Sequence, residues 1–179
     1  MKCLARILFA GLLVLGLSAC ETVGVAQNAP PVADVVGSSH QAADVLIAQA
    51  GKALSPGQAI IAASFVNIDD LERTSSFGRI VSQQVASRFA AKGYPVVEML
   101  LRHSVYIKQR GGEFLLSREV REISAEHDAQ AVIVGTYAMG RRNVYVTARL
   151  IRSADNRILA SYDYALPRDP DVSYLLRGH

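Results

Sequence analysis

Three strand-like runs follow one another near the end of the sequence, and they constrain its fold most strongly. They are "QAVIVGTYAM" (130–139), "NVYVTARLIR" (143–152) and "RILASYDYAL" (157–166). The links between them, "GRR" and "SADN", are short. Tight links of this kind join neighbouring antiparallel strands. The sequence therefore predicts an antiparallel β-meander.

The middle run also predicts which face of the meander is buried. Successive residues of a strand point to opposite faces of the sheet. One set consists of Val144, Val146, Ala148 and Leu150. It alternates with a mixed set of Tyr145, Thr147, Arg149 and Ile151. We expect this apolar set to face the core and helices to cover it.

A βαβ unit precedes the meander. The almost unbroken apolar run 58–67, "QAIIAASFVN", is typical of a central strand covered on both faces. Residues 77–92 are expected to form an amphipathic helix that ends at Gly93, with an apolar stripe of Phe77, Ile80, Val81, Val85 and Phe89. A second strand follows in "YPVVEMLL" (94–101). These elements predict an α/β (α+β) fold: a βαβ unit, a helix and the meander, with two or three helices packed on a mixed sheet.

Three shorter segments complete the predicted domain. Residues 40–54 favour a helix capped by Ser38 or Ser39, and "REVREISAEHD" (118–128) favours one capped by Ser117, with Val120 and Ile123 pointing inward. Residues 103–116 fit either an irregular lobe or two short strands about a Gly111–Gly112 turn. We favour the strands.

The N-terminus has the layout of an export signal. Lys2 and Arg6 precede an apolar run over 7–17, which is shorter than the roughly 20 residues that a membrane-spanning helix needs. The run ends in "LSAC", which resembles the lipobox of bacterial lipoproteins. This resemblance implies cleavage between Ala19 and Cys20, and acylation of Cys20. Several acyl chains on one residue would give a stable membrane anchor. The alternative is an ordinary secretory signal with a chance cysteine.

The predicted domain organisation follows from this signal. Residues 1–19 are the lipoprotein signal peptide, 20–39 the lipidated N-terminus and a flexible tether with Pro30–Pro31, and 40–179 a single domain. Glu21 stands where an aspartate would signal retention in the inner membrane, so we expect lipid anchoring in the outer membrane. Cys3 leaves with the signal, and no thiol remains for a disulfide or a metal.

Charge and motifs argue against nucleic-acid binding and catalysis. The mature chain carries 17 basic and 16 acidic residues, because two basic residues leave with the signal. Its densest basic spot, Arg141–Arg142, is interpreted as a solvated hairpin tip. The histidines are isolated, and no HExxH, GxSxG or GxGxxG pattern occurs. We expect no enzyme, no nucleic-acid partner, no metal, and no cofactor beyond the covalent acyl chains on Cys20.

Three tyrosines of the meander leave two interpretations open. Tyr145, Tyr162 and Tyr164 could pack across neighbouring strands, which is the commoner role of strand aromatics. They could instead form an exposed face that binds a protein partner, since tyrosine is enriched at such interfaces. The sequence favours cross-strand packing.

A set of segments resembles the domain of the FlgO family, outer-membrane lipoproteins associated with flagella. The segments are "SSFGRIVSQQVASRFAAKGYPVVE", "RGGEFLLSREVREIS", "AQAVIVGTYAMGRRNVYVTARLIR" and "RILASYDYALP". The resemblance covers residues from about 60 to 167 and is specific as an ordered set. In addition, "IIAASFVNIDDL" is similar to the opening strand and loop of the CsgG and TolB amino-terminal domains.

The resemblance implies a non-enzymatic protein that acts in flagellar assembly, anchoring or stability through protein contacts. Arg110, Gly111, Gly112 and Glu113 match the most recognisable family segment, so a partner contact is expected there. A Gly-Gly turn beside a helix cap can also be kept for folding alone. The alternative function is a general CsgG/TolB-like lipoprotein of envelope assembly or secretion, unrelated to motility. A homo-oligomer is compatible with both.

Overall fold

The computed structural model describes residues 31–99, 106–108, 114–116 and 118–177. The helices in this part are α1 (Val35–Ala50), the 3-10 turn η1 (Gly51–Ala53), α2 (Ser76–Ala91), α3 (Arg118–Glu126) and α4 (Pro170–Leu176). The strands are β1 (Ile60–Ala63), β2 (Val66–Asn67), β3 (Val96–Met99), β4 (Tyr106–Lys108), β5 (Phe114–Leu116), β6 (Ala131–Met139), β7 (Asn143–Arg152) and β8 (Ile158–Pro167).

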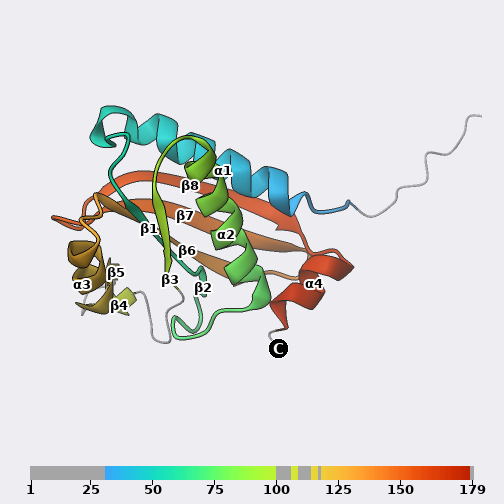
Figure 1. The fold of residues 1–179 in the computed structure, drawn as a ribbon. Helices are drawn as coiled ribbons and strands as arrows, with labels where there is room; N and C mark the ends of the chain where they lie inside the picture. Colours follow the sequence, from blue (N-terminus) through green and yellow to red (C-terminus); the bar gives the residue numbers. More distant parts are fainter. Residues whose placement is uncertain (1–30, 100–105, 109–113, 117, 178–179) are drawn as a thin grey trace, which may run out of the picture.

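A mixed sheet forms the centre of the domain. Its strands run in the order β3-β1-β6-β7-β8, and β2 also pairs with β6. β1 is parallel to β3 and β6, whereas β6, β7 and β8 are successively antiparallel. The predicted α/β (α+β) fold, with its βαβ unit (β1–α2–β3) and meander, is confirmed. Figure 1 shows α1 and α2 lying across the same face of this sheet.

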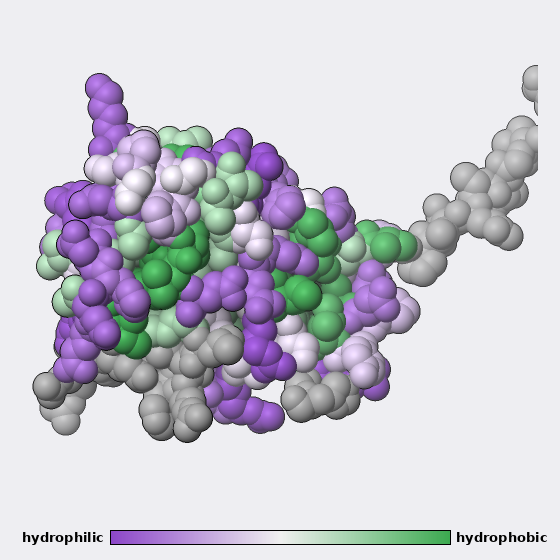
Figure 2. All heavy atoms as spheres, in the orientation of Figure 1, coloured by the Kyte–Doolittle hydropathy of each residue, from purple (hydrophilic) through white to green (hydrophobic). Residues whose placement is uncertain are grey.

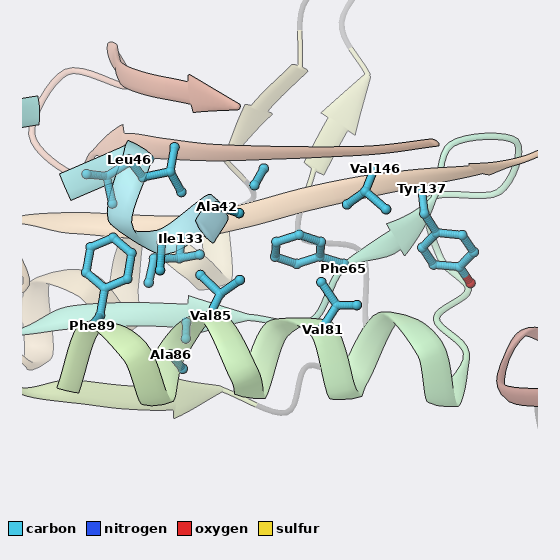
Figure 3. Packing of buried hydrophobic residues seen from close by; sticks show 14 of the residues in the cluster. Ala42, Leu46, Phe65, Val81, Val85, Ala86, Phe89, Ile133, Tyr137 and Val146 are labelled. Atoms are coloured by element: carbon cyan, nitrogen blue, oxygen red, sulfur yellow. The ribbon is translucent and has the colours of Figure 1, made fainter. Parts of the chain in front are cut away.

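The main core lies between the sheet and these two helices. Val144, Val146, Ala148 and Leu150 of β7 are each at most 1% exposed, as the alternation predicts. They belong to one buried cluster with α1 and α2, of which Figure 3 shows the centre around Phe65, Val81 and Val85. Burial of this apolar area is the main favourable contribution to folding.

A second, smaller cluster lies on the opposite face. It contains Ile61 of β1 and Val132 and Val134 of β6, together with Val120 of α3. Ile123 packs against this cluster, so the inward direction predicted for Val120 and Ile123 is confirmed. Both faces of the central strand β1 are therefore covered, which explains why its sequence reads as a continuous apolar run.

The first helix begins earlier than predicted. Its N-cap is Asp34, whose carboxylate accepts the Gly37 amide at 2.8 Å, rather than Ser38 or Ser39. Ser39 lies buried within the helix, and its hydroxyl donates to the Val35 carbonyl at 2.7 Å. Because α1 starts at Val35, residues 35–39 belong to the folded domain rather than to the tether predicted over 20–39.

The predicted central strand 58–67 is divided into β1 and β2 by a break at Ser64 and Phe65. The Phe65 amide donates to the Gly78 carbonyl at 3.3 Å, and the Thr74 hydroxyl donates to the Phe65 carbonyl at 2.7 Å. Phe65 therefore bonds to the start of α2 instead of a neighbouring strand. Its side chain is fully buried, so hydropathy alone does not reveal the break.

The helix predicted over 77–92 is confirmed as α2, but its buried stripe differs from the prediction. Ile80 is 37% exposed, whereas Ser82 is buried and its hydroxyl donates to the Ala63 carbonyl at 2.8 Å. At Gly78 a β-carbon would overlap the Phe65 carbonyl. The helix therefore approaches the sheet through small residues, which turns Ile80 toward solvent.

Two further segments complete the comparison with the sequence. The antiparallel pair favoured over 103–116 is confirmed by β4 and β5, which pair Lys108 with Phe114.

Helix α4 was not predicted, although Asp169 followed by Pro170 is a typical N-cap and first-turn pair. Among the described helices, none combines the length and apolar character that crossing a membrane requires.

Candidate protein-contact surface

The site residues predicted from the sequence lie outside the described residues. This holds for Ala19 and Cys20 at the processing site, and for Arg110, Gly111, Gly112 and Glu113 at the expected partner contact. The described strands β4 and β5 flank this last segment and lie with α3 at the end of the domain away from α4 (Figure 1). The processing site and the partner contact therefore both stay predictions.

Two of the three meander tyrosines belong to the core side. The rings of Tyr162 and Tyr164 stack with their centroids 5.8 Å apart, and both pack against the main cluster. Burial raises the pKa of the Tyr164 hydroxyl to about 12. Both rings lie on β8, where they stack along the strand and stand opposite Ala148 and Val146 of β7, so they contribute to packing rather than to an exposed partner-binding face.

Tyr145 lies on the face of the meander that points away from the main core, and its side chain is exposed to solvent. Its side chain is 55% exposed, and its strand neighbours on that face are Ala138 of β6 and Ala165 of β8. The ring also lies over Gly140, where an added β-carbon would come within 3.1 Å of Cε2. A large aromatic side chain is thus displayed among small neighbours, as in many protein-binding patches.

The surface around Tyr145 is mixed in chemistry. On the same face, Thr136 of β6 and Thr147 of β7 are paired and half-buried, and Asp163 of β8 lies opposite Thr147. We call this set, Thr136, Ala138, Tyr145, Thr147, Asp163 and Ala165, the outer meander face. Met139 at the end of β6 is 46% exposed, but it pairs with the core-facing Val144 and so lies on the other side of the sheet.

The edge of the sheet beside this face is protected against strand addition. The Ser161 amide of the edge strand β8 donates to the Gln49 side chain at 3.0 Å. The exposed Asp163 and the terminal Pro167 are residues that natural edge strands use against pairing with another chain. A partner would therefore contact the outer meander face rather than extend the sheet at β8.

The predicted hairpin tip carries a third arginine, Arg168, which lies far from Arg141 and Arg142 in the sequence. Beyond the pair Asn143–Pro167, the Arg168 amide donates to the Arg142 carbonyl at 2.8 Å, and the Arg168 guanidinium donates to the Gly140 carbonyl at 2.9 Å. We call Arg141, Arg142 and Arg168 the arginine tip. Counting residues outward along the β7–β8 hairpin would have revealed this neighbourhood.

The helix-covered side has a different surface. Apolar side chains appear there as small patches surrounded by hydrophilic ones (Figure 2). Asp44 of α1 accepts from Arg88 of α2 at 2.8 Å and lies 3.4 Å from Lys92. The Arg88 guanidinium holds the pKa of Asp44 below its usual value. This ion pair links α1 and α2 at the solvent-exposed surface of the domain.

The described residues offer little to a small ligand or a metal. No group of three or more His, Cys, Asp or Glu side chains among them could hold a metal ion. A hollow between α2 and the strands, lined in part by Arg79, Gln83 and Glu98, has a volume of about 10 Å³. This is room for about one water molecule. The exposed surface, not a cavity, is the candidate site.

The domain matches a known protein family. The family model described as "FlgO protein" matches residues 40–171, which include the sheet, α2, α3 and the start of α4. The chain belongs to the FlgO family. The match spans the segments on which the sequence resemblance was based. No curated protein sequence matches the chain significantly.

The solved structure of an LpoB domain shows the same fold at low sequence identity. The C-terminal domain of LpoB from Salmonella enterica aligns with a TM-score of 0.54 at 12% identity, covering 74% of this chain and 97% of that domain. A PelC dodecamer from Paraburkholderia phytofirmans aligns with a TM-score of 0.46 at 17% identity, covering 69% of this chain and 84% of that one. The FlgO-family domain thus shares its fold with the LpoB domain.

Proposed function

We propose that this FlgO-family protein is an envelope lipoprotein, anchored in the outer membrane through acyl chains on Cys20, that supports flagellar assembly, anchoring or stability. The family match over residues 40–171 is the observation that carries this proposal. The signal-like N-terminus, which ends in "LSAC", supports the lipid anchor.

The protein would act through contacts with other proteins rather than by catalysis. The outer meander face supports this, because it displays Tyr145 beside small neighbours on a rigid sheet. A rigid aromatic side chain contributes contact area at little entropic cost. The segment 110–113, which follows β4, remains the second proposed contact.

The test is a strain that lacks this gene, compared with the same strain restored by a wild-type copy. Swimming in soft agar and the number of filaments in electron micrographs are the measurements. The flagellar proposal expects loss of swimming or of filaments, repaired by the wild-type copy. Normal flagella in the deletion strain, or a host without flagella, would contradict it and favour the general envelope-assembly function.

A further inference from the structure

The chain enters the folded domain beside the arginine tip. The Ala33 amide, just before α1, donates to the Asp169 carboxylate at 2.9 Å, and Asp169 directly follows Arg168. Figure 1 shows the start of α1 and helix α4 at the same end of the sheet. The point from which the N-terminal segment departs is therefore adjacent to the tip.

The tip has three exposed cationic side chains and one exposed apolar one. Arg141, Arg142 and Arg168 are exposed, and Met139 is 46% exposed. Arginine pairs with phosphate groups in bidentate geometry. Its aliphatic stem can lie along apolar surface while its charged head stays in water.

Neighbouring acidic groups leave this cationic surface open on one side. The Asp34 carboxylate accepts a hydrogen bond from the Gly37 amide. The Asp169 carboxylate accepts hydrogen bonds from the amides of Ala33 and Val172. The acidic loop that contains Asp69 and Asp70 follows β2, on the side of β6 away from β7. Asp171 in the first turn of α4 is also exposed and offsets part of the charge near Arg168, so Arg141 and Arg142 at the β6–β7 turn are the more cationic part of the tip.

The N-terminal segment is short enough to keep the tip near an anchored Cys20. Thirteen residues lead from Cys20 to Ala33, and a fully extended chain spans at most about 3.6 Å per residue, or roughly 47 Å in total. Three arginines are fewer than the four to eight basic residues of a typical stand-alone anionic-lipid site. Tethering to the same membrane raises their effective concentration and supplies the remaining affinity.

We propose that the arginine tip lies against anionic phospholipid headgroups of the leaflet that holds the acyl anchor. This inference rests on the proposed acylation of Cys20. It orients the domain with the β6–β7 turn and the start of α4 at the membrane, and with α3, β4 and β5 at the end away from it (Figure 1). The strands β4 and β5, which flank the expected partner segment 110–113 in the sequence, would then lie on the side away from the membrane.

The test uses the full chain as the cell processes it, purified in detergent and reconstituted into phosphatidylcholine vesicles with or without phosphatidylglycerol. Met139→Cys, labelled with an environment-sensitive dye, reports on the tip, and Glu126→Cys at the end of α3 is the matched far-end label. We expect a blue shift of the Met139→Cys label in the phosphatidylglycerol vesicles alone, lost at high salt, and no shift of the Glu126→Cys label.

A charge-matched pair of variants separates the tip from overall charge. Each arginine near an anionic surface is worth about fivefold in binding, so Arg141→Gln with Arg142→Gln should weaken tip binding by roughly 25-fold. The same change at Arg121 and Arg157, away from the tip, should leave the shift in place. A shift that survives the tip variant, an equal shift in pure phosphatidylcholine, or no shift at all would overturn the inference.

Failure of the anchor itself gives a different result. The otherwise unsubstituted chain should float with phosphatidylcholine vesicles and take up no thiol label, because Cys20 would be acylated. A chain that stays in solution, or that is labelled at Cys20, would contradict the proposed lipoprotein on which the inference depends. Flotation without the phosphatidylglycerol-dependent shift would contradict the tip contact alone.

Discussion

The phenyl ring of Phe65 lies directly on the backbone of Gly135, so that a β-carbon at position 135 would overlap the ring carbons. Phe65 is fully buried between α2 and the sheet, and it occupies the break between β1 and β2. Gly135→Ala should therefore overpack the core and lower the free energy of unfolding by about 1–3 kcal/mol. Urea denaturation followed by circular dichroism measures this loss.

Its control is Thr136→Ala, the next residue of β6, whose side chain lies half-buried on the opposite face. That change should cost much less. In the Gly135→Ala background, Phe65→Leu should cost less than it does in the wild type, because a smaller side chain relieves the overlap. Strict additivity of the two changes would show that the ring and the glycine do not interact as described.

Asp169 should stabilise the contact between the segment before α1 and the start of α4. Its carboxylate caps α4 through the Val172 amide at 2.8 Å and accepts the Ala33 amide at 2.9 Å. Asp169→Ala should lower the free energy of unfolding at pH 7 by about 1–2 kcal/mol. Asp171→Ala, in the first turn of the same helix, should cost less.

The contribution of Asp169 should depend on pH. The amides of Ala33 and Val172 hold the pKa of this carboxyl below its usual value. Its stabilisation is therefore fully present above the unfolded pKa of about 3.9, and is lost as the pH falls toward the lower folded value. Denaturation of wild type and Asp169→Ala between pH 7 and pH 2.5 should show the difference shrinking on acidification. A constant difference would contradict this role.

Tyr164 should make the domain sensitive to alkali. Burial raises the pKa of its hydroxyl to about 12. Its contribution to stability is thus present below the unfolded pKa of about 10, and is lost as the pH rises from there toward 12. Tyr164→Phe should change stability little at pH 7 and should weaken the loss above pH 10. Equal alkaline profiles for the two proteins would exclude this effect.

Tyr145 and Tyr162 should separate function from folding. Tyr145→Ala removes an exposed side chain, so it should shift stability by no more than about 0.5 kcal/mol. Tyr162→Ala removes a ring packed on the core and should cost about 2 kcal/mol. If the outer meander face binds a partner, Tyr145→Ala should reduce swimming at a normal protein level. Full swimming with this variant would remove Tyr145 from the proposed contact.

Periodic segments were predictable, whereas elements set by single hydrogen bonds were not. The alternation in β7 reports burial directly, and the apolar stripe of α2 predicts the helix although Ile80 of that stripe is exposed. Asp34, Ser38 and Ser39 are all acceptable N-caps, and only the Gly37 amide bound by Asp34 decides between them. The break at Phe65 escaped prediction because the residue that leaves the strand is itself apolar and buried.

The candidate surface was predictable only in part. The sequence named Tyr145, Tyr162 and Tyr164 together, but register decides their roles. Tyr162 and Tyr164 stand opposite the core-facing Ala148 and Val146, whereas Tyr145 stands opposite Ala138 and Ala165 on the outer face. Arg168 joins the hairpin tip through the same pairing, because its amide donates to the carbonyl of Arg142, which lies 26 positions earlier in the sequence.

The most direct test of the central proposal is the number of flagella and the swimming of a strain whose only copy carries Cys20→Ser. Ser18→Ala, which keeps the cysteine, is the matched control, and carbonate-washed membranes report where each protein resides. An anchored flagellar lipoprotein predicts that Cys20→Ser is produced but released from membranes and fails to restore swimming, whereas Ser18→Ala stays bound and restores it. Full swimming with a released Cys20→Ser protein, or Cys20→Ser that remains in the washed membranes, would contradict the account.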